Sequence, residues 1–541
     1  MAGISIKQAG RWIKVDSPLG PDTLIPTYFE GDEEISSLFT YRLELISSMT
    51  SITPESVLGK DMTVHLFRPD GKTRVFHGRI VRFAAGSMWS HGNRRYHCEL
   101  VPWTWFLTRT TDCRIFEDEK VPDIIEKIFG DLGFSDYDMS GVDKGKHPKR
   151  EYCVQYRETD FNFVSRLMEE EGMYYFFKHE EGKHTMVLAD KVSAYLDCED
   201  KEVRFGASQD EKNAITRWQR GYSYKPGKWA QRDYNFKTPS DSLNTNKNTL
   251  LSVPQAQKYE MYDYPGLYIN KGDGDNVTTW RMEAEEAVYE ICEGESDCQP
   301  FSPGYKIKVS NHECDDEEGK TWVILSTHHV ATDYTHLAGE GAAPEYRNSF
   351  TCMPDSRLYR PPRKTPKPIV YGPHTAFVTG PAGEEIHTDE YARIRVNFHW
   401  EREDKKSMWS RVSQSWAGKK WGTQFIPRIG MEVIVEFLEG DPDRPIVTGC
   451  VYNADYMPPY ALTGNKTQSG WKTRSTTGGG SSDFNELRFE DKKGQEEVYF
   501  HAEKDFNRVV ENNDTLKVGF DKKDKGDQTI EVFNSQTLKV G

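Results

Sequence analysis

Short stretches in the N-terminal two thirds of the chain alternate apolar and polar side chains. In residues 40–46 (TYRLELI) and 63–67 (TVHLF), apolar side chains recur at nearly every second position. This is the period of a β-strand with one face buried. We therefore predict that residues 1–368 form a mainly β region with a few helices.

Only three segments have the period of a helix. In residues 160–171 one face carries Phe161, Val164, Leu167 and Met168, with Asp160 as a suitable N-cap and Gly172 as a stop. The pattern predicts two further helices, over residues 122–129 and 279–292. The last would place Ala284, Ala287, Val288 and Ile291 on one side.

A proline-rich joint at 360–368 (RPPRKTPKP) has neither period and is expected to be a stiff, extended spacer at a domain boundary. Beyond it, residues 391–400 and 431–437 alternate cleanly. The segment 440–445 (GDPDRP) is dense in turn-forming residues, before a short strand over 446–451. Close-spaced strands with almost no helix predict a small antiparallel barrel over 369–460.

After a connector (461–485, rich in Gly, Ser and Thr), the chain contains an internal repeat. Residues 510–519 recur as 532–541, with seven of ten positions identical. Each copy has too few apolar side chains to build a core alone, but equivalent strands could stack around a shared axis. We therefore predict that 486–541 starts a trimeric β-spike; an ordinary amphipathic hairpin is the alternative. The predicted trimer core is Leu516, Val518, Leu538 and Val540.

Composition narrows the function. The chain has 541 residues, enough for about three or four domains, and a formal net charge of −15 without a long basic block. Because phosphate backbones are bound by Lys and Arg, nucleic acid is not an expected partner. Nine scattered cysteines indicate reduced thiols. The sequence has neither a secretory signal nor an apolar run long enough to span a membrane.

Three groups of histidines and cysteines contain residue types that bind metals, but their arrangement disfavours a metal site. His179 and His184 are one residue too far apart for a zinc-protease helix, and Gly182 between them favours a turn. Cys292, Cys298, His312 and Cys314 lack a standard spacing. In the group His328, His329 and His336, the two adjacent histidines should point to opposite faces of a strand.

The aromatic side chains of the expected barrel could stack nucleic-acid bases, but they more plausibly fill cores or chain–chain contacts. They are Trp400, Trp409, Trp416 and Trp421. We predict no catalytic, cofactor-binding or metal-ligating residue, and no enzyme activity.

The run 415–445 (SWAGKKWGTQFIPRIGMEVIVEFLEGDPDRP) resembles the signature of VgrG, the valine-glycine repeat spike family of bacterial type VI secretion systems. The resemblance extends over essentially the whole chain. It includes residues 158–163, 170–172, 383–386, 391–396, 486–491, 497–502 and the Val-Gly pairs ending at 519 and 541. One position departs from it: Ala392 stands where the family is expected to place a glycine.

This resemblance implies an architecture similar to the hub and needle proteins of contractile phage tails. A hub-like base is followed by a barrel of the oligosaccharide/oligonucleotide-binding (OB) type and an intertwined three-chain β-prism. Phage needle relatives insert a lysozyme domain between barrel and prism. Here only about thirty residues separate Val451 from Glu486, too few for a catalytic domain.

The resemblance also implies partners and a location. The chain would form a homotrimer that caps the hexameric Hcp tube, meets baseplate proteins, and carries a PAAR-type tip and effectors. It would be cytoplasmic before firing and then leave the cell through the secretion apparatus. Two alternatives remain within this design: the spike of a phage tail or extracellular injection system, and a spike with a catalytic C-terminal extension. A carbohydrate- or nucleic-acid-binding barrel protein is disfavoured by the acidic charge and the terminal repeat.

Overall fold

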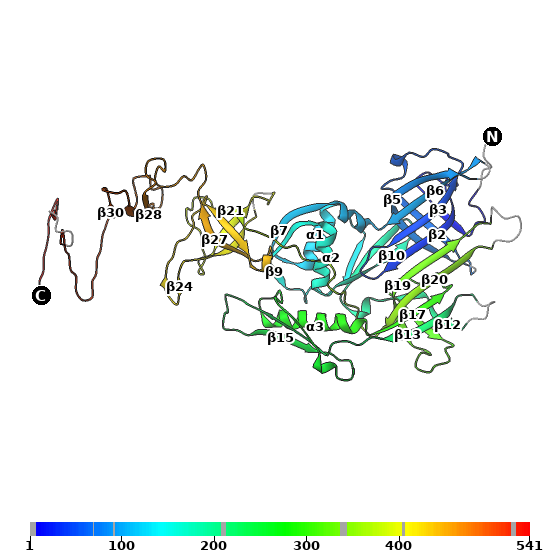
Figure 1. Cartoon of the computed structure of the whole chain (residues 1–541). Coiled ribbons are helices and arrows are strands. Elements are labelled where there is room, and N and C mark those ends of the chain that lie inside the picture. Colours follow the sequence, from blue (N-terminus) through cyan, green and yellow to red (C-terminus); the bar gives the residue numbers. More distant parts are fainter. Residues whose placement is uncertain are drawn as a thin grey trace. The chain divides into compact units, whose positions relative to one another are not determined.

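β-Strands make up most of the regular secondary structure of the chain, a computed structural model in which the described residues are 7–68, 70–89, 92–206, 212–335, 343–402, 406–520 and 526–541 (Figure 1). The expectation of a mainly β fold with a few helices is confirmed. We call the part up to residue 368 the base, and the strands from β21 (His374–Thr379) to β27 (Pro445–Val451) with their loops the barrel. The described residues also contain short 3₁₀ turns: η1 (Pro54–Ser56), η3 (Trp103–Arg109), η4 (Val192–Ala194), η5 (Ala256–Lys258) and η6 (Leu438–Gly440).

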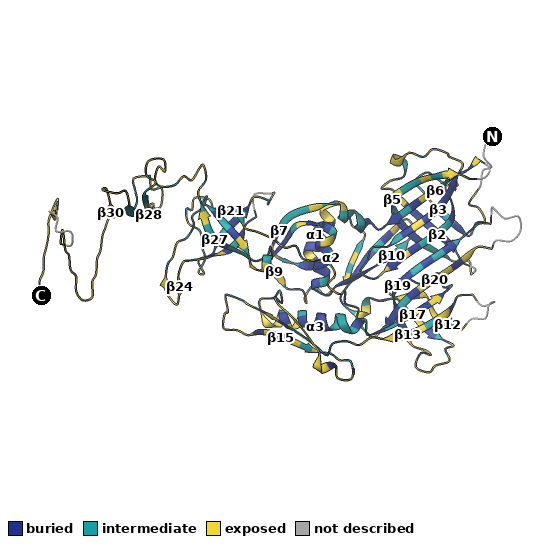
Figure 2. Ribbon diagram, in the orientation of Figure 1, coloured by how far each residue is buried: buried dark blue, intermediate teal, exposed yellow. Residues whose placement is uncertain are grey.

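The base is organised around a 12-stranded sheet in the order β1-β4-β5-β6-β3-β2-β19-β18-β12-β13-β17-β20. Its strands are β1 (Ile13–Asp16), β2 (Ile25–Glu34), β3 (Thr40–Ser47), β4 (Asp61–Phe67), β5 (Thr73–Met88), β6 (Arg94–Val101), β12 (Leu196–Phe205), β13 (Ala214–Tyr222), β17 (Glu290–Ser296), β18 (Tyr305–Ser310), β19 (Thr321–Thr332) and β20 (Glu345–Pro354). Buried and less buried residues alternate along the first six residues of β3, as the pattern of residues 40–46 predicts (Figure 2).

The second half of this sheet closes on itself. β19 pairs with β18 through its first residues and with β2 through its later ones, while its other edge pairs with β20. The strands β19-β18-β12-β13-β17-β20 therefore form a ring. Its interior is filled by side chains that include Trp322, Phe350 and Phe301.

Smaller sheets complete the base. β10 (Tyr174–Glu180), β11 (Lys183–Ala189) and β8 (Tyr137–Gly141) form one; β7 (Thr111–Lys120) and β9 (Lys149–Thr159) form another. β15 (Leu243–Asn248), β14 (Lys228–Asp233) and β16 (Glu260–Asp263) form a third, and helix α3 (Lys271–Ala287) contacts β14 and β15.

The helices occur where they were expected, with corrected ends. α1 is Val121–Asp131 and α2 is Asp160–Glu170. The N-cap of α2 is Thr159, whose hydroxyl accepts the Asn162 N–H, and Asp160 is instead the first helical residue. α3 is Lys271–Ala287, so the prediction of 279–292 was wrong at both ends. Ile291 and Cys292, expected on this helix, lie in β17.

The barrel is closed, with the strand order β21-β22-β23-β27-β26. Its strands are β21 (His374–Thr379), β22 (Ile394–Phe398), β23 (Met408–Val412), β26 (Glu432–Phe437) and β27 (Pro445–Val451). The alternating residues fill it as predicted: Ile394, Val396 and Val433 are fully buried. One detail differs, because β23 and β27 pair in parallel, so the barrel is not wholly antiparallel.

Contacts divide the chain into two compact units. The first contains residues 1–379, 388–426 and 433–449, and thus the base with most of the barrel. The second contains residues 380–387, 427–432 and 450–541. Its core element is an antiparallel sheet of β28 (Gln468–Lys472), β29 (Glu486–Glu490) and β30 (Glu497–His501). Past β30, the described residues of this single chain form no strand.

Candidate functional site at the junction of base and barrel

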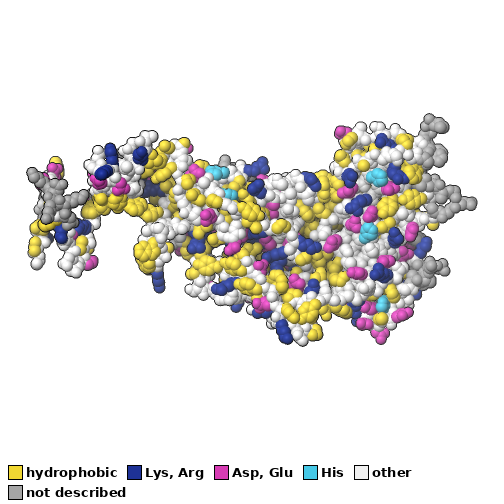
Figure 3. Space-filling model, in the orientation of Figure 1, with side chains coloured by type: hydrophobic (Ala, Val, Ile, Leu, Met, Phe, Trp, Pro, Cys, Tyr) yellow, Lys and Arg dark blue, Asp and Glu magenta, His cyan; other side chains and the backbone are white. Residues whose placement is uncertain are grey.

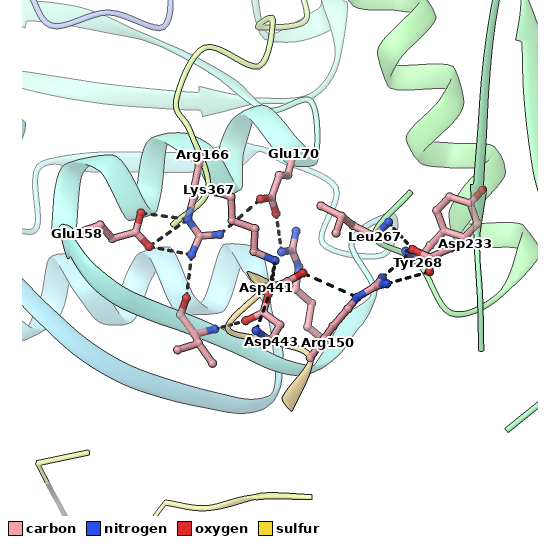
Figure 4. A network of polar contacts seen from close by, with 12 residues as sticks. Arg150, Glu158, Arg166, Glu170, Asp233, Leu267, Tyr268, Lys367, Asp441 and Asp443 are labelled. Carbon is pink, nitrogen blue, oxygen red and sulfur yellow. Dashed lines mark hydrogen bonds and ion pairs between the residues drawn. The ribbon is translucent and has the colours of Figure 1, made fainter. Parts of the chain in front are cut away.

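The turn between β26 and β27 holds the barrel on the base (Figure 4). Asp443 accepts a hydrogen bond of 2.6 Å from the backbone N–H of Val154 in β9. Arg444 donates to both carboxylate oxygens of Asp233, at 3.0 and 2.6 Å. A turn that the sequence indicates only as a chain reversal therefore carries two charged contacts to the base.

Lys367, at the end of the proline-rich segment, adds a third connection. Its Nζ lies 2.7 Å from an oxygen of Asp441 and 2.6 Å from one of Asp443. Burial lowers the pKa of this amine, but the charges of Asp443 and Asp441 outweigh burial and raise the pKa above its ordinary value. Lys367 is therefore a cation held between two carboxylates of the turn.

Behind this contact, Arg166 of α2 is almost fully buried. It donates to Glu158 at 2.8 Å and to the carbonyl oxygen of Val154 at 2.8 Å, and it pairs with Glu170 at 3.4 Å. The main chain of Val154 is thus bonded to Arg166 through its carbonyl and to Asp443 through its N–H. This residue links the buried charges of the base directly to the barrel turn.

Glu170 is shared between two guanidinium groups. Arg150 in β9 donates to its second oxygen at 2.6 Å and also to Glu171 at 2.7 Å. Burial alone would raise the pKa of Glu170, but Arg150 and Arg166 hold that pKa well below its usual range. The cluster stays ionised because each buried charge faces an opposite one.

Asp233 anchors the other side of the junction. Its side chain is fully buried and accepts backbone N–H groups from Leu267 at 2.7 Å and Tyr268 at 3.3 Å. The backbone of the β14–α3 region therefore orients this carboxylate before Arg444 binds it. The orientation makes the Arg444–Asp233 contact directional.

Further contacts surround a cleft of about 540 Å³ between these elements. Arg393 of the barrel pairs with Glu151 of the base at 2.8 Å. The backbone N–H of Trp409 donates to the Tyr152 hydroxyl at 2.7 Å. Phe236 of the base packs its ring against two arginines of the barrel. The guanidinium groups of Arg393 and Arg411 lie 5.5 and 4.9 Å from the centroid of that ring.

The proline-rich segment itself lies against the base. Both backbone N–H groups of Lys364 and Thr365 donate to Glu169 at 2.8 Å, and Arg360 pairs with Glu283 at 2.8 Å. The segment contains no helix or strand, and it is bonded to α2 through Glu169 and to α3 through Glu283. The base and the barrel are therefore joined by much more than a spacer.

The predicted trimer core lies outside this junction. Leu516, Val518, Leu538 and Val540 are 68, 39, 85 and 86% exposed in the single chain. None of them is in a strand. Their role in chain–chain packing stays a prediction, since the structure contains one copy.

Two of the candidate histidines share a buried carboxylate, because the Nε2 atoms of His179 and His329 lie 3.1 and 3.0 Å from the two oxygens of Glu33. His179 and His184 face each other across the β10–β11 hairpin, confirming a turn between them. His328 and His329 point to opposite faces, as expected: His328 pairs with Asp32 near the surface, and buried His329 contacts Glu33 and Tyr346. His336 lies outside the described residues.

The other candidate ligands do not form a site among the described residues. Cys292 and Cys298 are buried in the ring core, whereas Cys314 is exposed, and all nine cysteines are free thiols. Carboxylates gather around a histidine in two places, Asp16–His65–Glu181 and Glu30–Asp32–His328. In the second, Arg42 already lies 3.2 Å from Asp32 and provides the balancing charge.

The tryptophans expected to be core or contact residues differ from one another. Trp400 and Trp409 are half-buried, but Trp416 and Trp421 are 63 and 58% exposed, so this pair fills no core of the single chain and its role in chain–chain contacts stays a prediction. On the face in Figure 3, cationic and anionic side chains are interspersed over the base. No helix among the described residues is long and apolar enough to span a membrane.

The residues of the junction were not singled out by the sequence. Their signal was the charge pattern of the turn, with Asp441, Asp443 and Arg444 in four positions and only Pro442 between them. Such a pattern is typical of a solvated turn, and the partners Val154 and Asp233 lie more than 200 residues away in the sequence. Long-range pairing of this kind is invisible to a local pattern.

Three family models match the chain in consecutive order. Residues 32–335 match the phage tail baseplate hub (GPD) model. Residues 382–452 match the type VI secretion system/phage-baseplate injector OB domain, and 469–541 match the bacteriophage T4 gp5 C-terminal trimerisation domain.

Solved structures have the same fold. A type VI secretion component from E. coli, c3393, described as similar to the T4 tail proteins gp27 and gp5, has a TM-score of 0.60 at 24% identity, covering 81% of this chain and 99% of that one. A PdpA-VgrG complex has a TM-score of 0.57 at 10% identity, covering 88% and 94%.

Curated relatives are similar in sequence over nearly the whole chain. The type VI secretion system spike protein VgrG1a of Pseudomonas aeruginosa is 43% identical over 525 residues, which are 95% of this chain and 80% of the relative. VgrG1b of the same organism is 43% identical over 530 residues, 96% and 71%. The actin cross-linking toxin VgrG1 of Vibrio cholerae is 34% identical, covering 97% of this chain and 50% of the relative. The chain therefore belongs to the VgrG family of type VI secretion system spike proteins.

Proposed function

We propose that three copies of this chain form the spike that caps the hexameric Hcp tube and carries a PAAR-type tip and effectors into a target cell. The base docks on the tube and on baseplate proteins, and the C-terminal segment forms the prism behind the tip. The protein waits in the cytoplasm and leaves the cell when the apparatus fires. Its contribution is mechanical, without catalysis by residues 1–541.

The ion network between base and barrel is the observation that carries the mechanical part of this proposal. A spike that is pushed from its base must transmit force to the barrel without bending at the proline-rich segment. Lys367 and Arg444 bridge that segment through paired, directional contacts. The base and barrel can therefore move as one body.

The trimer follows from the match of 469–541 to a trimerisation domain together with the exposed apolar residues of that segment. Val498 and Phe500 in β30 are 62 and 65% exposed, and most of the apolar residues that follow them are exposed as well. Strands with one apolar face and no core of their own become stable when they pack around a shared axis.

Light scattering on the purified chain tests the proposal. We expect about three times the 62.3 kDa chain mass, and co-sedimentation of the trimer with purified Hcp rings. A monomer at micromolar concentration contradicts the trimer. A trimer that leaves Hcp rings in the supernatant contradicts the docking partner while keeping the assembly.

A spike bearing a catalytic extension is the second candidate, because the toxin VgrG1 has half of its length outside the match. The activity in that name belongs to that protein. Sequencing the complete gene separates the candidates: a long open reading frame beyond residue 541 favours the extension. A tail-sheath gene cluster of phage type beside it would favour a phage or extracellular injection system.

A further inference from the structure

A short hairpin projects from the barrel and carries three large exposed aromatic side chains. It consists of β24 (Ala417–Gly418) and β25 (Trp421–Gly422), in the loop between β23 and β26. Trp416, Trp421 and Phe425 are 63, 58 and 59% exposed. Single exposed apolar residues are ordinary, but a cluster of this size within ten positions marks an interaction surface.

The hairpin is held in one conformation. The Thr423 N–H donates to the Trp416 carbonyl at 2.9 Å, and the hydroxyls of Ser415 and Thr423 lie 3.0 Å apart. The side chain of Gln414 bonds both the N–H and the carbonyl of Phe425, each at 3.0 Å. Five residues of the loop are thus fixed by hydrogen bonds within the loop itself.

The two tryptophan rings are fixed as well. Their centroids are 5.0 Å apart and their planes meet at 89°, the edge-to-face arrangement that aromatic pairs favour. The Trp421 ring covers Gly418 so closely that a Cβ at residue 418 would lie 2.3 Å from it. Glycine is therefore required for this ring position, which presents an apolar surface before any partner arrives.

We propose that this hairpin is a clasp that docks on a second copy of the chain within the spike trimer. The inference rests on the proposed function for the trimer itself. Seventeen residues (452–468) separate the end of β27 from the matched trimerisation domain. Fully extended, they span at most about 60 Å, so three barrels share one small volume.

The short connection through residues 452–468 favours a neighbouring copy of the chain over a partner that is free in solution. Sites joined through a short linker meet at an effective concentration in the millimolar range. At that concentration even an aromatic contact of low affinity is formed most of the time. Charge favours the same occupant, because Lys419 and Lys420 at the hairpin turn are basic and the chain carries a net charge of −15. Bases of a nucleic acid could stack on tryptophan, but two lysines provide little phosphate binding.

Photo-crosslinking of the full chain tests the clasp. A Trp421→p-benzoylphenylalanine variant keeps an aromatic ring at this position. After irradiation, denaturing electrophoresis should show bands at two and three times 62.3 kDa, and peptide mapping should place the crosslink in another copy of the chain. The same photoreactive residue at Tyr371, which is 93% exposed, is the control and should give mainly uncrosslinked chain.

A second variant tests the built geometry. Gly418→Val must displace the Trp421 ring, so it should reduce the crosslink yield several-fold while the mass by light scattering stays that of a trimer. A trimer without crosslinked bands, or with crosslinks only inside one chain or to another molecule, overturns the clasp and leaves the spike proposal intact. A monomer overturns both.

Discussion

Removing the charge of Lys367 is the sharpest test of the junction. Lys367→Met keeps the length of the side chain but leaves Asp441 and Asp443 without their shared cation. These carboxylate side chains are only 6 and 13% exposed. Each carboxylate then remains buried beside the negative charge of the other. The contact between this turn and the base is weakened as a result.

The magnitude follows from this burial. Breaking a buried ion pair by removing one partner costs about 3 to 5 kcal/mol. Lys367 is one-fifth exposed, so we expect the lower end, about 3 kcal/mol. The base–barrel unit has about 440 residues, and an unfolding entropy of about 2.1 cal/mol/K per residue converts this loss to a fall of about 3 °C in Tm.

Differential scanning calorimetry measures the shift, and the rate of limited proteolysis between base and barrel measures opening of the junction. Lys364→Met is the matched control, because Lys364 lies in the same segment and is exposed; it should change Tm by well under 1 °C. Adding Asp443→Asn to Lys367→Met should recover part of the loss, since Asn still accepts the Val154 N–H. Equal Tm and equal proteolysis for Lys367→Met and wild type would show that solvent screens these pairs and that the junction argument is wrong.

Three further predictions test other parts of the chain. Ala392 has φ of 56°, a conformation that favours glycine, so Ala392→Gly should raise the free energy of unfolding by about 0.5 to 1 kcal/mol; a loss measured by chemical denaturation contradicts the strain. Burial lowers the pKa of His77 from 6.5 to about 4, so its neutral form stabilises the fold above pH 6.5 and this stability is lost as pH falls to 4, by about 3 kcal/mol. Urea titrations of wild type and His77→Gln at pH 7 and 4 should show a weaker acid loss in the variant, and identical losses would refute it. In the prism, Val518→Asp should abolish the trimer in light scattering while Lys517→Asp keeps it, because period two puts Val518 on the apolar face; the reverse result means that the register is inverted.

Sequence patterns predicted the barrel well and the third helix poorly, for physical reasons. Ile394, Val396 and Phe398 alternate because one barrel face is buried, and that local period survives into the structure. α3 starts at Lys271, in a run with Gly272 and Gly274 that propensity places outside a helix. Asn270 caps this helix, and the Tyr268 ring lies where a side chain at 274 would be, so tertiary packing overrides the glycine cost.

The departure at Ala392 shows what a resemblance adds to a pattern. Alternation alone indicates an ordinary strand through this position. The expectation of glycine there instead indicates a special backbone conformation, and the structure has it, with a turn bond of 3.1 Å from the Ala392 N–H to the Asp389 carbonyl. The following Arg393 then reaches Glu151 of the base.

Ion pairs at the junction suit a part that has to hold its orientation under load. An apolar contact is non-directional. It therefore opposes separation of the two surfaces but hardly opposes their sliding past each other. The Arg444–Asp233 pair is bidentate, and the Asp443–Val154 hydrogen bond fixes the same turn to a particular residue of β9. Replacing such pairs by apolar residues can even increase stability, so their presence here is better explained by geometry than by free energy of folding. These contacts keep the base and the barrel in one fixed relative orientation. Force transmission along a spike requires this property.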